Sequence, residues 1–67
     1  MQKLSHREEE VLKLIVEEQS SIEISSQLNI SIRTVETHRK NIAKKIVSSS
    51  LVAFTKYAIK HQIIQLK

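Results

Sequence analysis

The stretch from residue 31 to residue 46 carries the side chains with the clearest chemistry in this chain. A helix there, advancing roughly 100° per residue, would place an aliphatic stripe on one side: Val35, Ile42 and Ile46. The opposite side would gather hydrogen-bond donors and acceptors: Arg33, Glu36, Thr37, Lys40 and Lys44. A rim between the two would hold Thr34, His38, Asn41 and Lys45. A helix of this kind fits the DNA major groove, where base edges lie between two rows of phosphates.

An ordinary surface helix with a solvated charged face would show the same pattern, so the charge of the whole chain matters. The net charge is +4, and it is unevenly placed. Glutamates outnumber basic residues in positions 1–19, whereas basic residues far outnumber the single glutamate in positions 31–46. This asymmetry would turn the later helices toward a polyanion and favours double-stranded DNA as the partner.

Composition excludes several classes of protein. With 67 residues the chain is expected to form one domain with a small core. It has no cysteine, and its three scattered histidines form no ligand set, so no metal or cofactor is expected. No enzyme is expected either, because no carboxylate pair faces the histidines and a chain this short has little room for a pocket. No apolar run is long enough for a membrane span and no signal-peptide pattern occurs, which predicts a cytoplasmic protein without membrane contact.

Two capping boxes predict the first two helices. The box from Ser5 to Glu8 opens a helix from about His6 to about Glu18, and its predicted core face consists of Val11, Leu12, Leu14 and Ile15. The box from Ser20 to Glu23 opens a short helix that ends near Leu28, with Ile24 and Leu28 facing inward.

Asn29 can turn the chain after the second helix, since asparagine tolerates the left-handed conformation. Ser31 then caps the helix over 31–46. Two helices joined by so short a turn, the second one basic, form the outline of a helix-turn-helix.

The serines at 48–50 can cap a fourth helix. Its predicted apolar side is Val52, Phe54, Thr55, Ala58 and Ile59, with Tyr57 partly buried. The apolar end, residues 62–66, is expected to pack back on the first helix. The predicted fold is therefore all-α, a compact four-helix bundle that contains a helix-turn-helix.

These motifs together resemble the LuxR/FixJ-type (GerE-like) C-terminal DNA-binding domain of bacterial transcription regulators. The resemblance is carried by L-S-x-R-E-x-E-V-L-x-L at 4–14, S-x-x-E-I at 20–24, L-x-I-S at 28–31, T-V-x-x-H-x-x-N-I-x-x-K at 34–45 and Y-A-I at 57–59. It implies that residues 1–67 form a single domain of this type, the C-terminal fragment of a larger regulator with an N-terminal receiver or sensor domain.

The resemblance also implies roles in DNA binding. Glu36, Thr37 and Lys40 would read bases, because lysine can donate to guanine, glutamate can accept from cytosine N4, and the threonine methyl can meet that of thymine. The expected phosphate-binding residues are Ser20, Ser21, Ser31, Arg33, Thr34, His38, Asn41, Lys44 and Lys45. Two alternatives stay open: His38 as a half-buried histidine bonding the neighbouring helix, and Glu36 as a charge that tunes specificity by repelling phosphate.

Several positions depart from the family pattern. His6 replaces a usual proline, and Ile22 stands where a phosphate-binding lysine is frequent. Glu18, Val47 and Gln62 stand where glycine is common at helix ends. A side chain in the left-handed region costs roughly 1–2 kcal/mol, so these ends are expected either to rearrange or to leave the domain modestly stable.

Other functions compete with this interpretation. The promoter-binding helix-turn-helix of sigma factors shares the opening motif and the I-S turn. A helical protein-interaction module would use the fourth helix as a dimer face, centred on Leu51 and Thr55. The second alternative can coexist with DNA binding, because two copies paired through this helix could read two half-sites.

Overall fold

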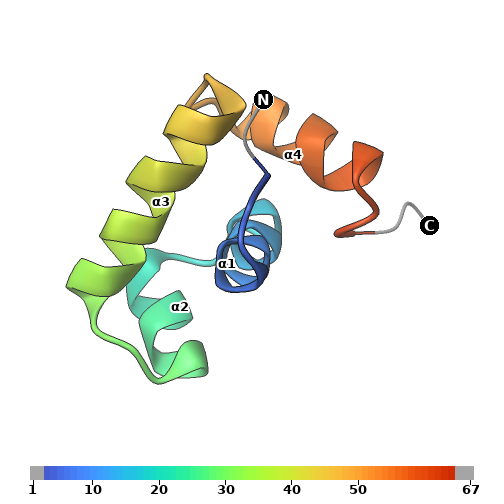
Figure 1. Ribbon diagram of the computed structural model, residues 1–67. Coiled ribbons are helices and arrows are strands. Elements are labelled where there is room, and N and C mark those ends of the chain that lie inside the picture. The colour runs from blue at the N-terminus through green and yellow to red at the C-terminus, as the bar shows by residue number, and fades with distance from the viewer. Residues whose placement is uncertain (1–2, 65–67) are drawn as a thin grey trace.

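The computed structural model describes residues 3–64, which form four helices and no strand. They are α1 (His6–Val16), α2 (Ser21–Leu28), α3 (Ile32–Ile46) and α4 (Leu51–Lys60). Helix α1 lies at the centre, with α2 and α3 on one side of it and α4 on the other (Figure 1). Along its three principal axes the domain measures 28, 27 and 20 Å. The predicted all-α fold with its helix-turn-helix is confirmed.

A serine precedes each helix and caps it. The hydroxyl oxygens of Ser5, Ser20, Ser31 and Ser50 each accept a hydrogen bond from the backbone amide three residues later. At the first two helices the glutamate of the capping box also accepts from the backbone amide of the serine, so both predicted boxes are confirmed. Each cap contributes about 1 kcal/mol, which matters for a domain with so small a core.

Left-handed residues follow all four helices, and none of them is glycine. Asn29 has φ 57°, as its predicted turn requires, while Glu18, Val47 and Gln62 have φ 65°, 65° and 58°. The chain therefore keeps the glycine-type turn at these ends instead of rearranging. The expectation that α1 reaches Glu18 is wrong by two residues, because the chain already turns at Glu17 to place Glu18 in this conformation.

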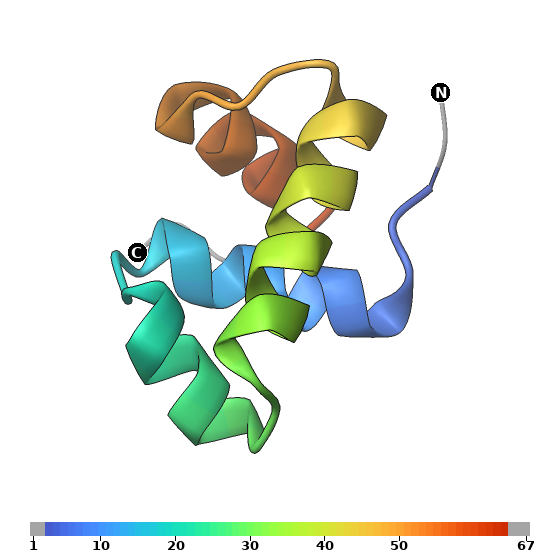
Figure 2. The same cartoon turned by 90° about the vertical axis from the view of Figure 1, so that its left-hand side faces the viewer.

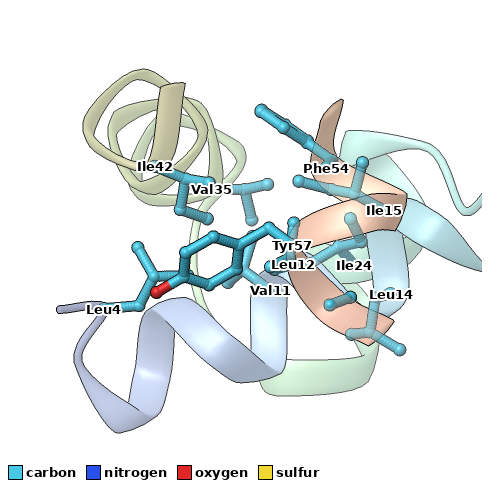
Figure 3. Packing of buried hydrophobic residues seen from close by; sticks show 11 residues of the cluster. Leu4, Val11, Leu12, Leu14, Ile15, Ile24, Val35, Ile42, Phe54 and Tyr57 are labelled. Carbon is cyan, nitrogen blue, oxygen red and sulfur yellow. The ribbon is translucent and has the colours of Figure 1, made fainter. Parts of the chain in front are cut away.

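Apolar side chains from all four helices converge around α1 (Figure 3). The core comprises Leu4, Val11, Leu12, Leu14, Ile15, Ile24, Val35, Ile42, Phe54, Tyr57 and Ala58. Ile63 and Ile64 pack against it, as expected of the apolar end, while Gln65 and Leu66 lie outside the described residues.

Helix α4 corrects two predictions. Val52 was expected in the core, but its side chain is 65% exposed, because the two-residue spacing puts it opposite the buried Phe54. Tyr57 was expected to be partly buried and instead belongs to the core. Its ring stacks on that of His61, with 4.1 Å between the centroids.

None of the four helices within residues 3–64 combines the length and the apolar character needed to cross a membrane.

Candidate nucleic-acid interface

Helix α3 is fixed to the domain by its aliphatic side. Val35 and Ile42 are fully buried, and Ile46 is half-buried against the core. Contacts with both α1 and α2 hold the helix from behind, so that its other side faces outward along its whole length (Figure 2). The predicted inner stripe is confirmed.

The outward side of α3 consists of the five polar residues expected there, all of them exposed: Arg33, Glu36, Thr37, Lys40 and Lys44. On the rim, His38, Asn41 and Lys45 are half-buried and Thr34 is exposed. We call the outward residues and the rim together the α3 surface. Four of its side chains carry a positive charge against the single carboxylate of Glu36, which suits contact with an anionic partner.

The turn between α2 and α3 fixes the direction in which α3 leaves. Asn29 adopts the left-handed conformation, and the amide of Ile30 donates to the carbonyl of Ser25 at 3.0 Å. Ser31 then accepts from the amide of Thr34 at 3.0 Å, and the two hydroxyl oxygens lie 2.8 Å apart. The turn is thus closed by local bonds at every step, which gives the second helix of the motif a defined orientation.

A polar contact joins the start of α2 to the second turn of α3. The hydroxyl of Ser21 donates a hydrogen bond to Oε1 of Glu36. Nε of Arg39 lies 3.8 Å from the same oxygen. We call this contact the Glu36 bridge. Sequence reasoning assigned Ser21 and Glu36 to different tasks and did not anticipate the bridge, because helical periodicity does not show which residues meet where two helices cross.

Two further hydroxyls of the predicted site are engaged within the protein. The oxygen of Ser20 accepts from the amide of Glu23 at 3.1 Å as the cap of α2. The hydroxyl of Thr37 donates to the carbonyl of Arg33 at 3.0 Å. The hydroxyl proton of Thr37 is thus already engaged, and the expected contact of its methyl group with thymine remains a prediction.

Lys45 has an internal partner that the sequence did not reveal. Its Nζ lies 2.7 Å from Oε1 of Glu8 on α1, with side chains 24% and 7% exposed. The two residues are separated by 37 positions, so no local pattern links them. A phosphate contact from Lys45 would require this ion pair to open, and that role remains a prediction.

Glu8 is ionised in an unusual setting for a carboxylate. Burial by itself would raise its pKa, but the hydrogen bonds from Lys45 and Ser5 and the charge of Lys45 together hold the pKa below its ordinary value of 4.5. Oε1 accepts from the Ser5 amide at 2.8 Å as well as from Lys45. One carboxylate therefore both caps α1 and ties the end of α3 to it.

The start of α4 exposes apolar side chains. Leu51 is 47% and Val52 65% exposed, and Val47 just before them is 84% exposed. Thr55 is half-buried, and its hydroxyl donates to the carbonyl of Leu51 at 2.8 Å. The dimer role expected of Leu51 and Thr55 remains a prediction, and the structure adds Val52 to the same exposed side.

A comparison with protein families decides what kind of domain this is. Residues 2–58 match the family described as bacterial regulatory proteins, luxR family. The chain belongs to this family. The match confirms the resemblance drawn from the motifs and favours it over the sigma-factor alternative. It identifies a LuxR-type helix-turn-helix of DNA-binding transcription regulators.

Curated relatives are regulators of the same kind. The chain is 41% identical over 61 residues to the transcriptional regulatory protein MctR of Rhizobium johnstonii, and 40% identical over 62 residues to the response regulator protein VraR of Staphylococcus aureus. It is also 42% identical over 57 residues to a response regulatory protein of Escherichia coli, YgeK. These alignments cover 91%, 92% and 85% of this chain but only 28%, 30% and 39% of the relatives. The chain thus spans between a quarter and two fifths of their length.

Proposed function

We propose that this LuxR-family domain binds double-stranded DNA in a sequence-dependent manner, with α3 in the major groove, and thereby regulates transcription. The α3 surface carries the proposal: it is a continuous polar and cationic helix face, held from behind by the buried Val35 and Ile42. An α-helix presented in this way has the width and the donor and acceptor groups that the major groove accommodates.

Three residues on the outward side of α3 are proposed to read bases. Lys40 would donate to guanine O6 and N7, Glu36 would accept from cytosine N4, and the methyl of Thr37 would meet a thymine methyl. All three are exposed, Glu36 and Thr37 on one turn of α3 and Lys40 on the next. Their spacing lets them reach neighbouring base pairs in the same groove.

Phosphate contacts would fix the position of the helix around these readers. Arg33 and Lys44 extend from the two ends of the outward side, and Thr34, His38 and Asn41 lie along the rim. The capping serines Ser20 and Ser31 and the neighbouring Ser21 stand at helix starts, whose amides also favour anions. Lys45 would join this set only after leaving Glu8.

Two copies are proposed to act together. A single recognition helix reads only a few base pairs, too few to select one site in a genome. The exposed Leu51 and Val52, with Thr55 beside them, would supply the contact between copies bound to adjacent half-sites. The relatives' greater length leads us to propose an N-terminal receiver or sensor domain in the complete regulator, which would act in the cytoplasm where the bacterial DNA lies.

A salt titration of duplex binding tests the proposal. A duplex selected from a random pool should bind at least a thousandfold more tightly than a random duplex, and the logarithm of both affinities should fall linearly with the logarithm of salt concentration. A domain that serves only protein interactions would bind neither duplex. Equal binding to both would reduce the function to non-specific DNA binding.

Substitution of Lys40 by alanine tests the base contact itself. Lys40→Ala should weaken binding to the selected duplex by about 1–3 kcal/mol and binding to the random duplex much less, because a base contact is lost. An equal loss on both duplexes would assign Lys40 to the phosphate backbone.

A further inference from the structure

The Glu36 bridge joins a proposed base reader to a proposed phosphate-binding residue. Oε1 of Glu36 accepts from the hydroxyl of Ser21 and lies 3.8 Å from Nε of Arg39. The carboxylate therefore occupies a place between two donors, one at the start of α2 and one on α3. Hydroxyl and guanidinium donors of this kind are also the groups that bind DNA phosphates. The Ser21 hydroxyl has one proton and cannot donate it to Glu36 and to a phosphate at once, and the nearby carboxylate offsets the charge that Arg39 could offer to a phosphate.

We propose that Glu36 exchanges partners on DNA, so that phosphate binding by Ser21 and Arg39 depends on the base sequence. On a random duplex the carboxylate stays in the bridge, keeps the hydroxyl proton of Ser21, offsets the charge of Arg39 and repels the phosphates nearby. On a site that presents a cytosine N4 amino group, the carboxylate turns to that base and leaves the Ser21 hydroxyl and the Arg39 charge free to contact the backbone. This inference rests on the proposed function and gives Glu36 a specificity-determining role within it.

The exposure of the bridge makes the exchange feasible. The side chains of Glu36 and Arg39 are 59% and 38% exposed. Ion pairs so open to water contribute little to stability, since solvent screens the charges and the long side chains lose entropy. A partner with a matched donor can therefore replace the bridge. The pair between Glu8 and Lys45, only 7% and 24% exposed, has no such freedom.

Charge explains why the exchange would sharpen selection. Glu36 is the single acidic residue between positions 31 and 46, among five basic ones. Near a phosphate row, the negative charge of Glu36 is repelled, and a repulsive element weakens binding to every wrong site. Only a site that offers the cytosine amino group offsets this repulsion with a hydrogen bond. Discrimination then comes from the base contact together with the freed Ser21 hydroxyl and Arg39 charge.

The exchange can be measured by fluorescence anisotropy on a selected and a random duplex across a range of salt concentrations. Glu36→Ala should strengthen binding to the random duplex about threefold to tenfold and steepen its salt dependence by about one unit, because Arg39 becomes free to contact a phosphate. The affinity ratio between the two duplexes should fall about tenfold or more. The C·G pair opposite Glu36 in the selected duplex can then be replaced. Wild type and Glu36→Ala should now show the same affinity ratio between this altered duplex and the random one.

Ser21→Ala, alone and combined with Glu36→Ala, tests whether the two residues are coupled. In the wild-type background the serine substitution should hardly change binding to the random duplex, because the hydroxyl is already occupied. In the Glu36→Ala background it should weaken that binding about threefold, since the free hydroxyl would then contact phosphate. Equal effects in both backgrounds would overturn the exchange.

Glu10→Ala is the matched control. Glu10 also forms an exposed pair with an arginine three residues away, 3.7 Å from Arg7, but it lies on α1 and has no contact with Ser21. Its removal changes the net charge equally and should strengthen binding to both duplexes alike. If Glu36→Ala behaves in the same way, Glu36 acts only through net charge and the exchange is wrong. A wild-type domain that prefers no duplex would instead overturn the proposed function.

Discussion

The two ends of α3 are held to the rest of the domain in different ways. At its start, exposed polar groups make the connection: the turn at Asn29, the cap of Ser31 and the Glu36 bridge. At its end, the half-buried ion pair between Lys45 and Glu8 makes the connection, and Val47 follows in a left-handed conformation. The two ends of α3 are therefore expected to have different roles. We expect the start to exchange its polar contacts with a ligand and the end to hold the helix in place.

Breaking the ion pair between Glu8 and Lys45 should have the largest effect on stability. Glu8→Ala leaves Lys45 half-buried without a partner and removes half of a capping box, so the free energy of unfolding should fall by about 2–3 kcal/mol. Urea denaturation followed by circular dichroism measures this change. Ser21→Ala, which removes the α2 partner of Glu36 near the start of α3, should alter stability by less than about 0.5 kcal/mol. Equal losses of unfolding free energy in Glu8→Ala and Ser21→Ala would contradict these different roles.

Neighbouring lysines at the end of α3 should separate stability from DNA binding. Lys45→Ala should lower the free energy of unfolding by about 1–3 kcal/mol, because Glu8 loses its partner, and should leave the salt dependence of DNA binding unchanged. Lys44→Ala should do the reverse and lower the salt slope by about one unit, since Lys44 is exposed. A lower slope for Lys45→Ala would mean that the ion pair opens on DNA, as the sequence alone predicted.

The two left-handed turns that flank α3 should respond unequally to glycine. Val47→Gly should stabilise the domain by about 1 kcal/mol, because valine is branched at Cβ and poorly suited to φ 65°. Asn29→Gly should change stability by only about a few tenths of a kcal/mol, since asparagine already tolerates this conformation. Thermal melts of the two variants beside the wild type would show the contrast. A destabilised Val47→Gly variant would mean that another interaction of this side chain outweighs the relief of strain.

Acid should weaken the ion pair between Glu8 and Lys45. The pKa of Glu8 is lower in the folded protein than its ordinary value, so its ionised form stabilises the fold above that value, and this contribution is lost as the pH falls through the folded-state pKa. Stability of the wild type measured between about pH 6 and pH 3 should therefore fall more steeply than that of Glu8→Gln. Parallel curves would show that Glu8 adds nothing to the pH dependence.

Local features of the sequence predicted the start of α3 well and its end poorly. The cap at Ser31 and the turn at Asn29 involve residues within a few positions of each other, so residue types suffice to identify them. The ion pair between Glu8 and Lys45 spans 37 positions, and nothing in the spacing of either residue indicates it. Val52 was misplaced for a related reason: a short helix with apolar residues on two sides does not reveal which side meets the core.

The outward side of α3 was also predictable, because its polar residues follow from helical spacing once Val35 and Ile42 are assigned to the core. What spacing cannot supply is the state of each side chain. The hydroxyls of Ser21 and Thr37 are bound within the protein, to Glu36 and to a backbone carbonyl. These bonds depend on helix crossing and rotamer, which residue types do not determine.

The central position of α1 bears on how the domain opens. Helix α1 packs against each of the other three, and Val11 and Leu12 within it are fully buried. Fraying of α2 or α4 uncovers one side of α1 and leaves its remaining contacts in place. The middle of α1 loses its cover only when the whole domain unfolds. Its amide hydrogens are therefore protected from exchange with solvent up to the global free energy of unfolding, while amides of the peripheral helices exchange through smaller, local openings.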